Sequence, residues 1–138
     1  MFPRVREITD ALGGRMRLTV EAHPGGGRVL IERPHQRGCP RVALDGYGAE
    51  LLTGYIMAAR LALPHGLPEE PIDGPFPATL RLVTKPRVTM LIDRPAPAPA
   101  PERPLELPAT FWDRLYAELC LVTAHTRELA RRAGCGIH

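Results

Sequence analysis

The residues of this chain that could do chemistry are few, and their spacing decides what each could do. His35 and Cys39 stand four residues apart, a spacing that a structural zinc site could use. His23 is the nearest candidate for a third ligand, but it precedes a glycine run at residues 25–27 that is typical of a hairpin turn. The strand after the turn would hold His23 about 20 Å from the other two. We therefore expect ordinary loop residues and no metal.

Two carboxylates, Glu32 and Asp93, invite a second chemical interpretation because each is followed by Arg and Pro. A pair of carboxylates can carry out general acid–base catalysis. Local pairing with Arg33 and Arg94 at the ends of two strands accounts for them more simply. His125 has no serine or cysteine nucleophile motif beside it, and the chain contains no serine. We expect no catalytic residues, no cofactor and no enzyme activity.

Arginine is the most abundant reactive group of the chain. The formal net charge is +3, and only Lys85 among the 18 basic residues is a lysine. A basic excess can attract nucleic acid, although a GC-rich genome produces the same composition, rich in arginine, alanine and proline. The basic side chains that we expect on exposed sheet faces and turns are Arg17, Arg28, Arg41, Arg81, Lys85 and Arg87. They could hold phosphates, but no aromatic residue lies in the core of a predicted repeat strand, where bases would stack.

The elements that must position these residues come from a repeated unit. The segment LIERP at residues 30–34 returns as LIDRP at residues 91–95. Around each copy an alternating segment comes first, then the strand that carries the signature, a loop, a short strand and a helix. The first unit covers about residues 15–63 and the second about 78–133, with a proline-rich linker at 64–77. Residues 2–11 are a candidate for one further strand.

This pattern predicts an α+β fold in which two β-β-β-α repeats form one pseudo-twofold domain, with antiparallel sheets and two main helices. Ile31 and Ile92 should occupy equivalent, buried positions. The other matched positions are Leu18 with Leu80, Val42 with Leu105, and Leu44 with Leu107. The helix at 49–63 is apolar nearly all round, so we expect its own sheet to cover one side and the second helix the other.

The best local match to known proteins is PLELPATFWDRL at residues 104–115, where a short strand turns through proline into a helix that carries aromatic residues. The segment VALD at 42–45, which leads to Leu51 and Leu52, repeats that pattern. In topology the chain resembles the Pur-repeat and Whirly families and the positive-cofactor transcriptional coactivators. The resemblance implies a sheet-plus-helix unit that pairs with itself and binds single-stranded nucleic acid.

Size and composition set the remaining expectations. A chain of 138 residues predicts a single domain. Three cysteines without paired spacing favour a reducing compartment, and we expect a cytoplasmic location because the N-terminal residues lack an apolar signal segment. No apolar run has the length, about 20 residues, that a membrane span needs. Two alternatives stay open: a protein-interaction or assembly module, homo-oligomers included, that uses the apolar helices and the proline-rich loop at 95–101, and a small-molecule-binding domain.

Overall fold

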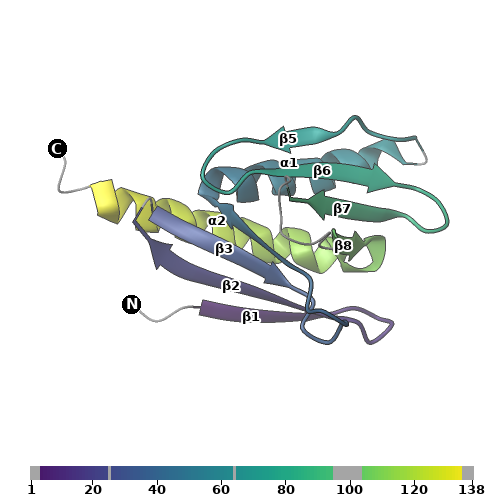
Figure 1. Ribbon diagram of the computed structural model, residues 1–138, viewed down its shortest axis with the longest axis horizontal. Coiled ribbons are helices and arrows are strands. Elements are labelled where there is room, and N and C mark those ends of the chain that lie inside the picture. The colour runs from purple at the N-terminus through teal and green to yellow at the C-terminus, as the bar shows by residue number, and fades with distance from the viewer. Residues whose placement is uncertain (1–3, 25, 64, 95–103, 135–138) are drawn as a thin grey trace.

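The computed structural model describes residues 4–24, 26–63, 65–94 and 104–134. It shows an α+β fold with two antiparallel four-stranded sheets and two long helices (Figure 1). In each sheet the strands lie in chain order, and a helix follows the last strand. The proline-rich segment at 95–101 lies outside the described residues.

The first sheet contains four strands, one more than the first predicted repeat. Its elements are β1 (Arg4–Thr9), β2 (Arg15–His23), β3 (Gly26–Glu32) and β4 (Arg41–Asp45), followed by helix α1 (Gly46–Ala62). The additional strand β1 lies within the candidate segment at 2–11. Asp45 begins α1 as its N-cap, because its Oδ1 accepts a hydrogen bond from the Gly48 amide at 2.8 Å.

The second sheet also contains four strands. Its elements are β5 (Glu70–Ile72), β6 (Ala78–Val83), β7 (Thr89–Asp93) and β8 (Leu105–Pro108), followed by a 3-10 turn, η1 (Ala109–Phe111), and helix α2 (Trp112–Gly134). The prediction of a plain linker at 64–77 is therefore wrong in part, because β5 lies within it. Pro71 is tolerated in β5 because this strand is at the edge of the sheet.

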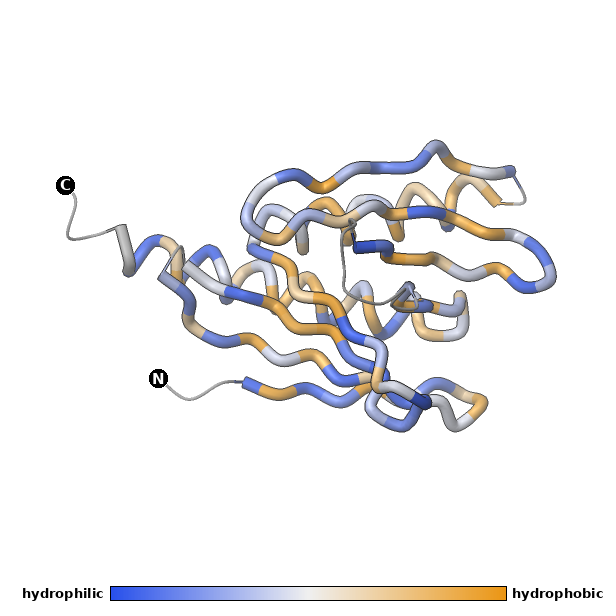
Figure 2. Tube along the Cα trace, in the orientation of Figure 1, coloured by the Kyte–Doolittle hydropathy of each residue, from blue (hydrophilic) through white to orange (hydrophobic). Residues whose placement is uncertain are grey.

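The register of the two sheets places the repeated signature in corresponding surroundings. Ile31 in β3 pairs with Leu18 on one side and Val42 on the other. Ile92 in β7 pairs with Leu80 and Leu105 in the same way. Both isoleucines are buried, as the sequence predicts. Apolar and polar residues alternate along these strands, so each sheet has one apolar face and one mixed face (Figure 2).

The helices lie behind the sheets, and each contacts the half of the chain to which it does not belong (Figure 1). Helix α2 crosses the first sheet, where small residues allow it to come close to β3. A Cβ atom on Gly27 would lie 3.0 Å from Thr126 Cγ2, and one on Gly26 would lie 3.0 Å from Ala130 Cβ. Helix α1 packs against α2 and against β5 and β6 as well as β3 and β4. The sequence predicts that its own sheet and α2 cover α1. The structure shows that strands of the second sheet cover it as well.

One cluster of buried apolar side chains contains residues from both sheets and both helices. Trp112 is 2% exposed, and its indole N–H donates to the Leu107 carbonyl at 2.8 Å. This bond fixes the start of α2 against the end of β8. Neither α1 nor α2, the two long helices of the described chain, has the length and apolar character to cross a membrane.

Candidate functional site

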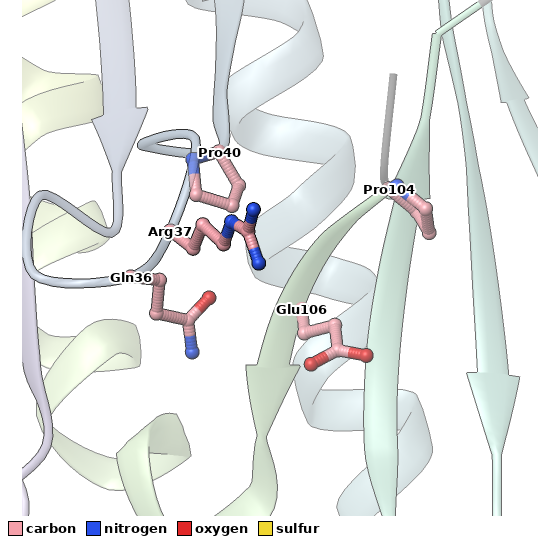
Figure 3. A pocket seen from close by; sticks show the side chains of 5 residues that line it. All are labelled: Gln36, Arg37, Pro40, Pro104 and Glu106. Carbon is pink, nitrogen blue, oxygen red and sulfur yellow. The ribbon is translucent and has the colours of Figure 1, made fainter. Parts of the chain in front are cut away.

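A cleft opens between the two sheets, where the loop from β3 to β4 faces strand β8 (Figure 3). It has a volume of about 440 Å³. Its lining residues are Gln36, Arg37 and Pro40 from the loop, and Pro104 and Glu106 from the β8 side. Side chains that can donate and accept hydrogen bonds therefore face the same space from two parts of the chain that are far apart in sequence.

The loop at one wall of the cleft is held by its own backbone. The Arg33 amide donates to the Pro40 carbonyl at 2.9 Å and closes the loop at its base. Inside it, the Gln36 amide donates to the Arg33 carbonyl at 3.1 Å, and the Cys39 amide donates to the Gln36 carbonyl at 3.0 Å. Gly38 has a φ of 81°, a value that glycine adopts without steric cost. These bonds set the directions in which Gln36 and Arg37 project.

A buried arginine joins the two sheets beside the cleft. Arg33 is 7% exposed; its Nε donates to the Arg15 carbonyl at 2.9 Å and its Nη1 to the Glu106 carbonyl at 3.2 Å. The guanidinium also lies 4.7 Å from the centre of the Phe111 ring, within the range of a cation–π contact. Burial lowers the pKa of Arg33. The predicted local pairing with Glu32 is wrong, since Arg33 reaches to β8 and η1 instead.

A second polar contact fixes the turn between β1 and β2 against η1. The Thr110 hydroxyl donates to Asp10 Oδ2 at 2.7 Å, and the Gly14 amide donates to Asp10 Oδ1 at 2.6 Å. The hydrogen bond from Thr110 is the main cause that lowers the pKa of Asp10, with smaller contributions from the amides of Gly14 and Leu12. Together with Arg33, this contact ties the first sheet to the start of α2.

Three arginines gather around the loop that borders the cleft, and a histidine lies beside one of them. We call Arg15, His35, Arg37 and Arg41 the basic rim. Arg15 Nη1 lies 3.5 Å from His35 Nε2, and Arg37, which is exposed, lines the cleft itself. Arg41 is exposed at the first position of β4, directly after the loop. Among the described residues, we find no carboxylate that forms an ion pair with Arg15, Arg37 or Arg41.

Three of the six predicted phosphate-binding residues are held by carboxylates on the mixed faces of the sheets. Arg17 Nε lies 3.6 Å from Glu7 Oε1, and its Nη1 lies 3.9 Å from Glu32 Oε1. Arg28 donates to the Glu21 carboxylate. On the second sheet, Arg81 Nε donates to Asp93 Oδ2 at 2.7 Å. These partners offset much of the positive charge that a phosphate would meet.

The other three predicted residues lie at the end of a strand or in a turn. Arg41 belongs to the basic rim, and Lys85 and Arg87 are exposed in the turn between β6 and β7. The six residues therefore do not form one surface, since they divide between two sheets and their ends. Sequence reasoning missed Arg15 and Arg37 because it treated the 35–40 segment as plain loop and did not place it opposite β8.

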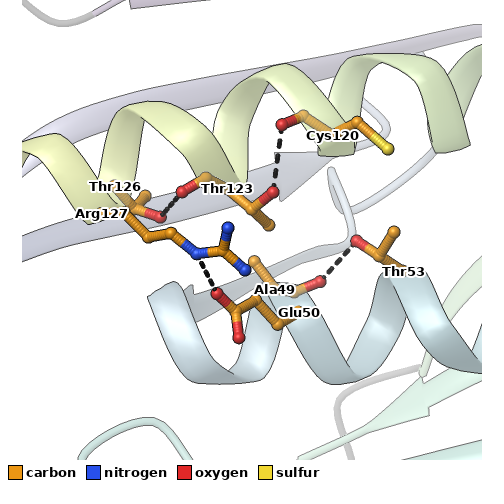
Figure 4. A network of polar contacts seen from close by, with 7 residues as sticks. All are labelled: Ala49, Glu50, Thr53, Cys120, Thr123, Thr126 and Arg127. Carbon is orange, nitrogen blue, oxygen red and sulfur yellow. Dashed lines mark hydrogen bonds and ion pairs between the residues drawn. The ribbon is translucent and has the colours of Figure 1, made fainter.

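A further pair of hollows follows the exposed seam between the two helices. Arg127 Nε donates to Glu50 Oε1 at 2.6 Å across this seam (Figure 4). The hydroxyls of Thr53, Thr123 and Thr126 donate to carbonyls within their own helices. The hydrogen-bonding groups here satisfy one another, and most apolar side chains of both helices are buried, with Tyr47, Leu61 and Leu121 as exposed exceptions. The seam therefore offers less to a ligand than the inter-sheet cleft.

Metal binding has no support in the part of the chain that the structure describes, where no three His, Cys, Asp or Glu side chains are grouped closely enough to hold an ion. The Cys39 thiol points to Glu32 Oε2 at 3.8 Å. No protein-family model matches the chain, and no curated protein matches it.

Proposed function

We propose that this chain is a non-catalytic binding protein that contacts single-stranded nucleic acid through the basic rim and the inter-sheet cleft. The observation that carries the proposal is the position, beside a polar cleft, of arginines that have no carboxylate partner among the described residues. A phosphate attracts cations that are not already paired, because an ion pair must otherwise be broken or shared. The sheet faces, which the sequence favours, are less suitable because Arg17, Arg28 and Arg81 have carboxylate partners.

The cleft also offers groups that suit a nucleobase. Gln36 carries an amide that can donate and accept, and Glu106 on the opposite wall can only accept while it is ionised. A splayed-out base of a single strand presents its Watson–Crick edge to such groups. Arg37 would then hold the neighbouring phosphate. No aromatic side chain is among the described lining residues, so we expect phosphate contacts, not stacking, to dominate the affinity.

We further infer that the two halves are copies of one unit related by a pseudo-twofold axis, as in the Pur-repeat and Whirly resemblance. The supporting observations are the repeated order of four strands and a helix, and the matched partners of Ile31 and Ile92. A cytoplasmic location belongs to the same proposal. It is supported by Cys39 and Cys120, which are free thiols.

The test is a titration of a fluorescently labelled single-stranded oligonucleotide, followed by anisotropy at several salt concentrations. The wild-type affinity should fall steeply with salt, because each neutralised phosphate of a single strand contributes a slope of about −0.7 in log K against log salt. Arg15→Ala with Arg37→Ala should reduce this slope by up to two such contacts. Arg131→Ala with Arg132→Ala removes the same charge from the far end of α2 and should leave binding nearly unchanged.

Two results would contradict the proposal. One is a wild-type protein that does not bind at low salt, which would favour the protein-interaction alternative. The other is equal loss of affinity in the rim variant and the α2 control, because net charge rather than the cleft would then set the affinity. A Glu106→Gln variant tests the contact with the base separately from the contacts with phosphate. It should change the preference among homopolymer oligonucleotides while the salt slope stays the same.

A further inference from the structure

The outer face of the first sheet, the face turned away from α2, has an ordered pattern of which the proposed function uses only Arg41, at one edge. The strand register places four residues in one row across the sheet, one from each strand: Val5, Thr19, Leu30 and Ala43. Val5 is 54% exposed, and the other three are partly exposed. We call this the apolar row. It crosses the full width of the sheet in the direction perpendicular to the strands.

Charged residues border the apolar row on both sides, and their signs alternate from strand to strand. One border contains Glu7, Arg17, Glu32 and Arg41, and the other contains Glu21, Arg28 and Asp45. These two borders hold four acidic and three basic residues, so the face has no positive excess that would attract a polyanion. Nucleic acid is therefore a poor occupant of this face.

We propose that this face is the interface of a homodimer, in which the first sheets of two copies pack face to face. A twofold axis along the apolar row lays that row on its own copy, with Leu30 against the partner subunit's Leu30. The same rotation exchanges the two borders. Arg17 then faces the partner subunit's Glu21, and Arg41 faces the partner subunit's Asp45. Glu32 is only 8% exposed, so it adds no contact with the partner. Each contact between the borders occurs twice, as an isologous interface requires.

The axis along the row is preferred over an in-plane axis along the strands. Both axes bring unlike charges together because the signs alternate. Only the axis along the row, however, sets Leu30 and Val5 against their own copies, whereas the axis along the strands sets Leu30 against Thr19. Two sheets commonly pack face to face about 10 Å apart, and the side chains of the apolar row can span that distance.

The second sheet provides an internal comparison. Leu91 in β7 corresponds to Leu30, but its neighbours in the row are Arg81 and Glu106. A charged residue on either side of the leucine interrupts any apolar row there. The pattern is thus a property of the first sheet and not a consequence of strand alternation in general.

The area of the outer face determines the expected affinity of the dimer. Four strands about 4.8 Å apart and three rows about 7 Å apart make a contact of roughly 400 Å² per subunit, which is smaller than a standard specific interface and in the range of weak, transient ones. We expect a reversible dimer that forms in the micromolar range. Sedimentation velocity from low to high micromolar concentration should show monomer converting to dimer. A wild-type protein that stays monomeric at several hundred micromolar would overturn the proposal.

Matched variants locate the interface. Leu30→Glu should abolish the dimer, and Leu91→Glu, the same change on the second sheet, should leave it intact. Circular dichroism and thermal melting confirm that both variants fold. Loss of the dimer in both variants, or in neither, would contradict the assignment.

A charge exchange tests the axis without a change in net charge. Glu21→Arg combined with Arg28→Glu keeps the ion pair within the chain but sets the new positive charge at position 21 against the partner subunit's Arg17. The dimer should weaken by about tenfold or more, since like charges in contact are costly. Unchanged dimerisation would rule out the proposed axis. None of these substitutions touches Arg15 or Arg37, so dimerisation and nucleic-acid binding can fail separately.

Discussion

Arg33 is the residue whose environment differs most from what its neighbours in sequence indicate. It follows a strand and precedes a proline, where an exposed ion pair with Glu32 is the simple expectation. Instead its side chain is buried and bonds to carbonyls of Arg15 and Glu106. A buried cation without a carboxylate in contact is unfavourable unless hydrogen bonds compensate for its lost hydration. The carbonyls and the Phe111 ring supply that compensation.

The first prediction concerns this arginine. Arg33→Met keeps most of the side-chain volume but removes two charge-assisted hydrogen bonds and leaves two carbonyls without that donor, so we expect a loss of about 2–4 kcal/mol in the free energy of unfolding. Urea denaturation measures it. Arg37→Met is the control, since Arg37 is exposed, and should change the free energy by less than about 0.5 kcal/mol. Equal effects in the two variants would mean that Arg33 does not join the sheets.

The second prediction concerns pH and Asp10. The pKa of Asp10 is lowered from its ordinary value of 3.8, chiefly by the Thr110 hydroxyl. The folded state therefore favours the ionised form. This stabilisation is complete above the unfolded pKa and disappears as the pH falls through the lower folded pKa. Asp10→Asn removes the titrating group, so the difference in urea midpoint between pH 7 and pH 3 should be smaller than in the wild type.

A second carboxylate, Glu118, determines how much acid sensitivity should remain in the Asp10→Asn variant. Its pKa is also lowered, mainly by its hydrogen bond with Arg6. The Asp10→Asn variant should therefore keep part of the wild-type acid sensitivity. An Asp10→Asn variant with the full wild-type dependence would show that the contact with Thr110 does not stabilise the folded state.

At the scale of elements, the sequence predicts what depends on local pattern and misses what depends on distant contacts. The alternation around Leu18, Ile31 and Leu80 predicts three strands in the correct places, and Asp45 is correctly placed among the capping residues. Strand β5 was missed because Pro71 and its neighbours read as linker, and only pairing with β6 makes them a strand. The cleft was missed for a related reason, since Arg37 and Glu106 meet only when the two sheets are assembled.

The third prediction concerns the close approach of α2 to β3. Gly27→Ala would bring a methyl group 3.0 Å from Thr126 Cγ2 and 3.2 Å from Leu129 Cδ1. We expect this overpacking to cost about 1–3 kcal/mol in a urea titration. Gly54 in α1 is the matched control, because nothing lies within 4 Å of a Cβ there. Gly54→Ala should stabilise the protein by up to about 1 kcal/mol, since alanine favours the helix. The same sign of effect at both glycines would contradict the close packing.

The two halves of the molecule are held together because the helix of each half packs against the other half. Helix α2 follows the second sheet in the chain but crosses the first, and the Tyr55 hydroxyl of α1 donates to the Pro68 carbonyl, just before the second sheet, at 3.0 Å. The exposed ends of the halves are joined as well, since Arg6 Nε of β1 donates to Glu118 Oε2 of α2 at 2.8 Å. Neither half can therefore bury its apolar surface without the other.

The last prediction follows from this packing of each helix against the other half. A chain divided between His65 and Gly66 should give two fragments that are unfolded separately, because the first sheet lacks α2 and the second sheet lacks α1. Mixed in equal amounts, they should recover native circular dichroism, and the fluorescence of Trp112 should shift to the blue as the indole is buried. A first fragment with Gly27→Ala should associate more weakly, whereas one with Gly54→Ala should associate at least as well as the wild type. Cooperative unfolding of the second fragment alone would refute the shared core, because a sheet that folds without α1 would not need the first half of the chain.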